Sequence, residues 1–209
     1  MTLFDRIVLL ATGLVAAYLV WRFYSRYTKT KQLHDIYYML GFVVLLVSGL
    51  LLIFLGYDIL ASPYVLTVAS LIPLGISLGL MNQFFKPWKK AYAWFALVGF
   101  LAIAITSIAG SDLRKLAVPI FHGVAGLIIF GGPIKVFLEK KAPSGFWWVG
   151  VGGALIGLGG IALAFLSSGS QLLFFSQSFV MTILAPLLLL MSLAFAFGFM
   201  KDIIKDLKK

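Results

Sequence analysis

Seven long apolar stretches, separated by short polar connections, dominate this 209-residue sequence. They cover about residues 4–24, 34–56, 64–85, 91–110, 116–138, 146–168 and 179–200. At about 1.5 Å per residue, each can cross a hydrocarbon core about 30 Å thick. Because backbone polar groups cannot stay unpaired in lipid, such stretches are expected to be helices. The sequence therefore predicts an all-α, seven-transmembrane-helix bundle that forms a single domain, with a short basic cytoplasmic tail at 201–209.

The composition agrees with this class of protein. Hydrophobic residues make up 62% of the chain and charged residues 11%, which excludes an ordinary soluble domain. The chain has no cysteine, so disulfides, thiolate catalysis and cysteine-bound metals are excluded. The first stretch is expected to be retained, because Trp21-Arg22-Phe23 stands near its end, where a signal peptide would need a small-residue cleavage site.

The positive charges predict the orientation. Fourteen of the 17 lysines and arginines fall on one side of the predicted bundle and three on the other. This asymmetry predicts an outside amino terminus and a cytoplasmic carboxyl terminus, in a plasma or inner membrane. Nucleic-acid binding is not expected, and membrane lipids are the expected partners of this basic surface. The residues proposed to hold lipid headgroups are Arg22, Arg26, Lys86, Lys89, Lys90, Lys135, Lys140 and Lys141.

An internal repeat is indicated by an offset of 113 residues, which places the first three stretches over the last three. The offset superposes Arg22 on Lys135 and brings Pro73 within one residue of Pro186. The fourth stretch then joins two parallel three-helix units. This layout resembles that of the sugar-transporting SWEET family, which implies a 3+1+3 parallel-repeat fold and a transport function. SWEET proteins carry prolines in the first two helices of each repeat, whereas the first, second and sixth stretches here have none.

Microbial rhodopsins share the span count and orientation, but they need a lysine in the seventh span to bind retinal. The stretch 179–200 contains no lysine, so a retinal protein is excluded.

Small residues recur at helical spacing in two stretches and predict close helix packing. They are Gly75 and Gly79 in the third stretch, and Gly153, Gly157, Gly160 and Ala164 in the sixth. Packing within the bundle is favoured over a subunit interface.

The polar residues at depth are few. His122 lies about two turns into the fifth stretch, with Gly126 one turn further on. Its structural interpretation is a hydrogen bond to a neighbouring helix; the alternatives are a haem or metal ligand, a proton relay or a contact in a ligand pocket. Ser48, Asn82 and Gln83 are further candidates for ligand binding or helix contact.

The acidic residues all fall at the ends of stretches or in the tail, so no buried carboxylate is expected. No catalytic constellation can be assembled from the sequence, and neither enzymatic activity, a metal nor a cofactor is expected.

Three functions remain open. The first is an accessory or scaffolding subunit of a larger membrane assembly, which could bind lipid or another apolar ligand and associate with other subunits or with itself. The second is a small parallel-repeat transporter, and the third is a seven-span sensor that acts through a separate cytoplasmic partner.

Overall fold

The computed structural model describes residues 1–167 and 176–207, and most of these described residues are helical. Within the described residues no strand is present. The helices are α1 (Leu3–Thr30), α2 (Leu33–Leu55), η1 (Tyr57–Ala61), α3 (Pro63–Ala69), α4 (Leu71–Phe84), η2 (Lys86–Trp88), α5 (Lys89–Ile108), α6 (Arg114–Leu138), α7 (Trp147–Ser167) and α8 (Gln177–Leu207). The prediction of an all-α fold is confirmed.

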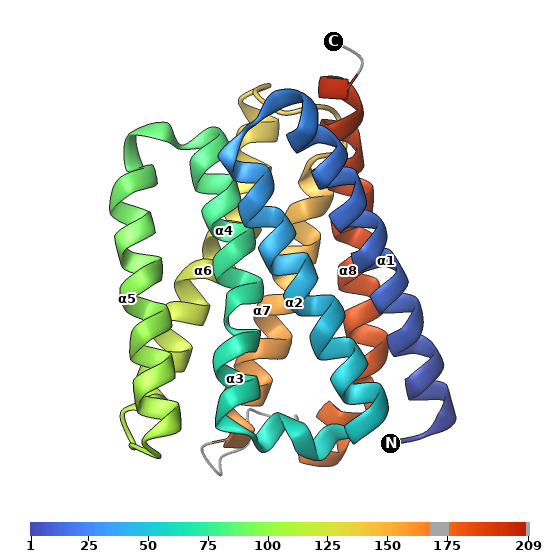
Figure 1. Ribbon diagram of the computed structural model, residues 1–209, viewed down its shortest axis with the longest axis vertical. Helices are drawn as coiled ribbons and strands as arrows, with labels where there is room; N and C mark the ends of the chain where they lie inside the picture. The colour runs from blue at the N-terminus through green and yellow to red at the C-terminus, as the bar shows by residue number, and fades with distance from the viewer. Residues whose placement is uncertain (168–175, 208–209) are drawn as a thin grey trace.

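The long helices stand side by side and alternate in direction (Figure 1). Among the described residues, six segments are long and apolar enough to cross a membrane, if α3 and α4 are taken together, and α7 holds a shorter apolar segment, Trp147–Gly160. The seven predicted stretches therefore match seven helical rods. By length and composition, this is the architecture of a multi-pass membrane protein.

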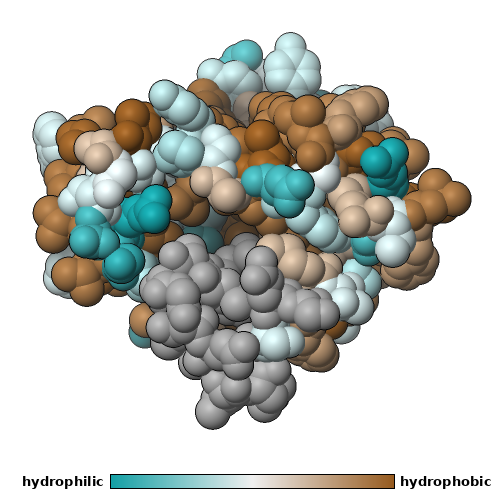
Figure 2. All heavy atoms as spheres, turned by 90° about the horizontal axis from the view of Figure 1, so that it is seen from below, coloured by the Kyte–Doolittle hydropathy of each residue, from teal (hydrophilic) through white to brown (hydrophobic). Residues whose placement is uncertain are grey.

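The two ends of the bundle differ in charge. We call the end that holds the α1–α2 turn, η2, the α6–α7 connection and the last turns of α8 the basic end, because most of the lysines and arginines lie there. The opposite end holds the amino terminus, η1 and the α5–α6 connection, and we call it the N-terminal end (Figure 1). Seen from there, hydrophobic side chains and groups of more hydrophilic ones are mixed over the coloured part of the face (Figure 2).

The third stretch is a broken helix rather than the continuous one predicted. Its two parts, α3 and α4, meet at Ser70. Pro73 has no N–H to donate to the carbonyl of Ala69, which removes one bond of the helical ladder at the break. Beside the break, the Ser70 hydroxyl donates a hydrogen bond to the Thr67 carbonyl at 2.7 Å.

The basic tail is also structured differently from the prediction. The helix α8 continues through Leu207, and Asp202 and Ile203 are buried. The last turns of α8 therefore belong to the bundle.

The helices α1, α2, α4, α6, α7 and α8 pack in a ring in that order, and α8 closes it against α1. The helix α5 lies at the edge of the bundle, against α3, α4 and α6 (Figure 1). Each contact in one half of the ring has a counterpart in the other half: α1–α2 matches α6–α7, α2–α4 matches α7–α8, and α4–α6 matches α8–α1. Such matched contacts are compatible with a 3+1+3 repeat, but the repeat itself stays a prediction.

Candidate functional site

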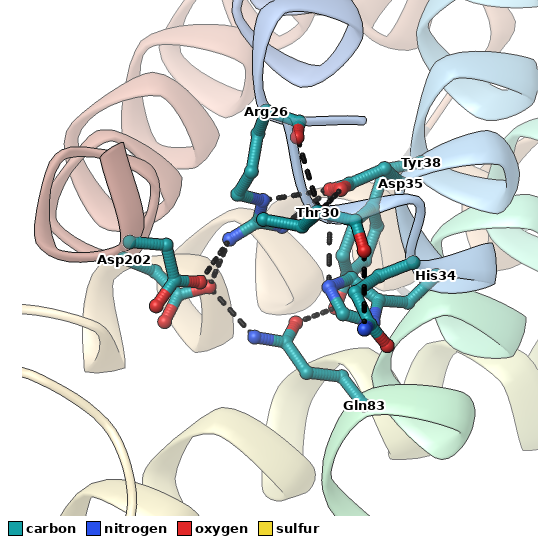
Figure 3. A network of polar contacts seen from close by, with 9 residues as sticks. Arg26, Thr30, His34, Asp35, Tyr38, Gln83 and Asp202 are labelled. Carbon is teal, nitrogen blue, oxygen red and sulfur yellow. Dashed lines mark hydrogen bonds and ion pairs between the residues drawn. The ribbon is translucent and has the colours of Figure 1, made fainter. Parts of the chain in front are cut away.

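A buried network of charges lies at the basic end and is centred on Arg26 of α1, whose side chain is fully buried (Figure 3). Its Nε donates to Asp35 Oδ1 on α2 at 2.7 Å, and its Nη2 lies 2.6 Å from the same oxygen. Its Nη1 donates to Asp202 Oδ2 on α8 at 2.6 Å. The more exposed Asp206 lies one turn further along α8, 3.4 Å from Nη1. One guanidinium therefore joins three helices.

Two neutral side chains extend this network to α4. Gln83 donates through Nε2 to Asp202 Oδ2 at 2.7 Å and accepts a hydrogen bond from the Tyr38 hydroxyl at 2.8 Å. Asp202 is thus held from both α1 and α4. Because a buried carboxylate is costly unless charges and hydrogen bonds satisfy it, these contacts make its burial possible.

An aromatic layer lies next to the network. The rings of Phe23 and Tyr38 stack with centroids 4.9 Å apart, and Phe199 meets both at 5.2 and 4.7 Å. Phe42 and Phe195 continue the layer, with their centroids 5.8 Å apart. All five rings are fully buried, so the basic end is closed by charged and aromatic side chains together.

The network corrects two sequence predictions. Asp35 is fully buried and Asp202 nearly so, although no buried carboxylate was expected. Arg26, expected to hold lipid headgroups, instead points into the bundle and pairs with both of them. The helices α1 and α8 extend beyond the predicted stretches, and they cover these residues with protein.

A mostly apolar cavity of about 150 Å³ lies inside the ring, toward the N-terminal end. The six ring helices, α3 and η1 line it, and the break between α3 and α4 borders it through Ala69, Ile72 and Pro73. Ser48 is one of its few polar neighbours; the others are Thr12, whose hydroxyl donates to the Val8 carbonyl at 3.0 Å, and His122.

His122 lines this cavity and also contacts α7. Its ring lies against Gly160, where any side chain would collide with Nε2, and it interacts with the backbone of Ile156. No hydrogen bond of good geometry to a described residue reaches the buried Nε2. The position of His122 thus combines two of the roles considered for it, a helix contact and a pocket wall.

The other candidates for ligand binding or helix contact lie in different parts of the structure. Gln83 belongs to the network, whereas its neighbour Asn82 is half-buried outside it. Ser48 lines the cavity. Gly126 faces Gly157 of α7, and a Cβ at Gly126 would lie 3.8 Å from the Gly157 Cα.

The glycines proposed to allow close helix packing differ in how much room surrounds them. A Cβ at Gly75 would lie 2.9 Å from the Tyr37 carbonyl oxygen, one at Gly79 would collide with the Tyr38 ring, and one at Gly153 would lie 2.5 Å from the Ile129 carbonyl carbon. A Cβ at Gly157 would meet nothing within 4 Å, because the residue opposite is also a glycine. Gly157 therefore does not need to be small for α6 and α7 to touch. The surroundings of Ala164 lie outside the described residues.

The remaining proposed lipid-contacting residues lie near the surface of the basic end. Lys86, Lys89, Lys90, Lys135, Lys140 and Lys141 are exposed and Arg22 is half-buried. Lys141 and Lys135 pair with Glu139 at 2.7 and 3.2 Å, and these contacts hold the pKa of Glu139 below its ordinary value.

Comparison with known proteins adds no relative: no protein-family model matches the chain, and neither a curated protein nor a solved structure is significantly similar to it.

Proposed function

We propose that this chain is a non-catalytic integral membrane protein that binds a small apolar molecule, or the end of a lipid chain, inside its helix ring. The cavity near His122 is the observation that carries the proposal. Dry apolar cavities of about 150 Å³ bind benzene or xenon. Its lining offers apolar contact on nearly every side and so favours a hydrocarbon-like ligand over a sugar or an ion.

The experiment uses benzene as the probe. A ligand that binds the folded state raises its stability by mass action, so benzene should raise the melting temperature of the detergent-solubilised protein. Gly49 lines the cavity, and a Cβ there would meet only the Leu9 carbonyl oxygen at 3.9 Å. Gly49→Leu should therefore fill the cavity and abolish the benzene-dependent shift.

Gly123→Leu is the matched control. It makes the same substitution in α6 at a position where a Cβ would meet nothing within 4 Å, and which does not line the cavity. This variant should keep the benzene shift of the native chain. Equal shifts in all three proteins would mean that benzene acts through the detergent, and the proposed site would be wrong.

The proposed setting is a plasma or inner membrane, with the basic end in the cytoplasm. Cysteines can report this because the native chain has none. A cysteine at Ser62, at the N-terminal end, should react with an impermeant thiol reagent added outside cells. One at Ser144, exposed at the basic end, should react only after the membrane is opened. The reverse pattern would refute the orientation.

The wider role that we favour is an accessory or scaffolding subunit of a membrane assembly. A transporter is the second candidate, and the matched contacts in the two halves of the ring support it because they are compatible with a parallel repeat. Purification in mild detergent separates the two: the first predicts foreign membrane subunits at fixed stoichiometry, and the second predicts a self-sufficient protein that moves its ligand into vesicles.

A further inference from the structure

His34 is a second unusual histidine, and it belongs to the charge network rather than to the cavity (Figure 3). It lies in the first turn of α2 and only 8% of it is exposed. Its Nε2 is buried without a hydrogen-bond partner among the described residues. Nε2 lies 3.9 Å from the carboxylate oxygen Oδ1 of Asp35. A buried imidazole nitrogen is thus directed at a carboxylate but does not reach it.

The oxygen that faces His34 is already in use. Arg26 approaches Asp35 Oδ1 with two nitrogens, Nε at 2.7 Å and Nη2 at 2.6 Å. The other oxygen of Asp35 lies 3.4 Å from the Thr30 hydroxyl. A protonated His34 would therefore have to share Oδ1 with Arg26, or displace it.

The charged and titratable groups around His34 come from every neighbouring element. Arg26 of α1 and Lys86 of η2 oppose a positive charge on the His34 ring, whereas Asp202 of α8 favours one. On α2 itself, Asp35 adjoins it and the Tyr38 ring lies 6.0 Å from it, centroid to centroid. The two buried carboxylates, Asp35 and Asp202, share one buried guanidinium, so these three side chains together carry a net negative charge that a second cation would balance.

We propose that His34 and Asp35 form a proton-binding site that competes with Arg26 for the same carboxylate oxygen. A proton from water adds to the free imidazole nitrogen, so both ring nitrogens then carry N–H, and no covalent bond breaks. A small rotation of the ring brings Nε2–H onto Asp35 Oδ1, and the hold of Arg26 on α2 weakens. Acidification at the basic end therefore loosens the link between α1, α2 and α8.

The direction of the pH effect follows from this competition. Above the ordinary pKa of histidine the imidazole is neutral and Arg26 keeps both of its contacts with Asp35. As the pH falls, the state with a loosened network binds an additional proton and gains population by linkage. The native chain should thus lose thermal stability as the pH falls from about 7 to about 4.

The test compares thermal unfolding across this pH range in the detergent-solubilised native chain, His34→Gln and His122→Gln. Glutamine keeps a hydrogen-bonding side chain but cannot titrate. His34→Gln should flatten the fall in melting temperature. His122→Gln removes the other buried imidazole but leaves the network intact, so it should retain the part of the fall that the network causes. A native chain whose stability is constant or rises on acidification, or an unchanged pH profile in His34→Gln, would overturn the proposal.

A second measurement applies even if His34→Gln does not fold. The chain has only two histidines, so in His122→Gln the imidazole NMR signals belong to His34 alone. These signals should titrate together with the guanidinium signal of Arg26 as its contact with Asp35 is lost. Titration of His34 with no change at Arg26, or no titration at all between about pH 7 and pH 4, would contradict the competition.

Discussion

The two ends of the bundle differ in how their interiors are filled. At the basic end, the network of Arg26, Asp35, Asp202 and Gln83 ties four helices together beside an aromatic layer that fills the interior. Toward the N-terminal end, the same helices surround an apolar cavity with little polar lining. The helices are thus fixed to one another by directional contacts at one end, and are separated enough to leave space at the other.

This difference assigns a distinct role to each half. A network of buried hydrogen-bonded charges specifies one arrangement of helices, because any other arrangement strands a charge. Residues around an apolar cavity lack packing contacts, so a molecule that fills the cavity stabilises the folded protein. We therefore interpret the basic end as the part that fixes the fold and the cavity as the part that binds.

The largest expected effect comes from removing the centre of the network. Arg26→Leu leaves Asp35 and Asp202 buried without their cation, and breaking a buried ion pair in this way costs about 3–5 kcal/mol of unfolding free energy. Arg6→Leu makes the same substitution at an exposed arginine of the N-terminal end and should be nearly neutral. Thermal unfolding in detergent measures both.

A rescue variant sharpens the interpretation. If stranded carboxylates cause the loss, adding Asp35→Asn and Asp202→Asn to Arg26→Leu should recover part of the stability, because uncharged amides cost less to bury. Equal stability of Arg26→Leu and the native chain would show that the network does not hold this end together.

A smaller effect on stability should distinguish a tightly packed glycine of α7 from one that faces open space. A Cβ at Gly153 would lie 2.5 Å from the Ile129 carbonyl carbon and 2.6 Å from the Phe130 nitrogen, and such backbone atoms cannot move aside easily. Gly153→Ala should therefore cost about 1–3 kcal/mol. Gly157→Ala, one turn further along, meets nothing and should be neutral or gain up to about 1 kcal/mol from helix propensity. Equal losses in the two variants would mean that α6 and α7 pack differently.

The sequence predicts the helices well because lipid imposes a strong local rule. A run of about 20 apolar residues has few alternatives to a membrane helix, and each of the seven stretches corresponds to a helical rod. The break at Ser70 was missed, although Pro73 is the signal that could have indicated it. Proline position alone does not predict a break, since Pro186 lies within the continuous α8.

The candidate sites were harder to predict because they depend on contacts between distant residues. Arg26 and Asp202 are 176 positions apart, and hydropathy places both near span ends, where charges ordinarily face headgroups. One local signal was available: Asp202 and Asp206 fall one turn apart, on one face of the apparent tail. No sequence pattern indicates the cavity, because its volume depends on how the helices of the ring pack around small residues such as Gly49 and Gly159.

The proposed ligand site can be tested most directly by locating xenon in the protein. Crystals of the native chain pressurised with xenon should show an anomalous peak inside the helix ring, among Leu9, Ile72 and Leu188, and the peak should vanish in Gly49→Leu. No peak is expected among the packed rings around Phe199 at the basic end. Xenon found only on the lipid-facing surface, or equally strong in Gly49→Leu, would contradict the assignment of binding to the cavity.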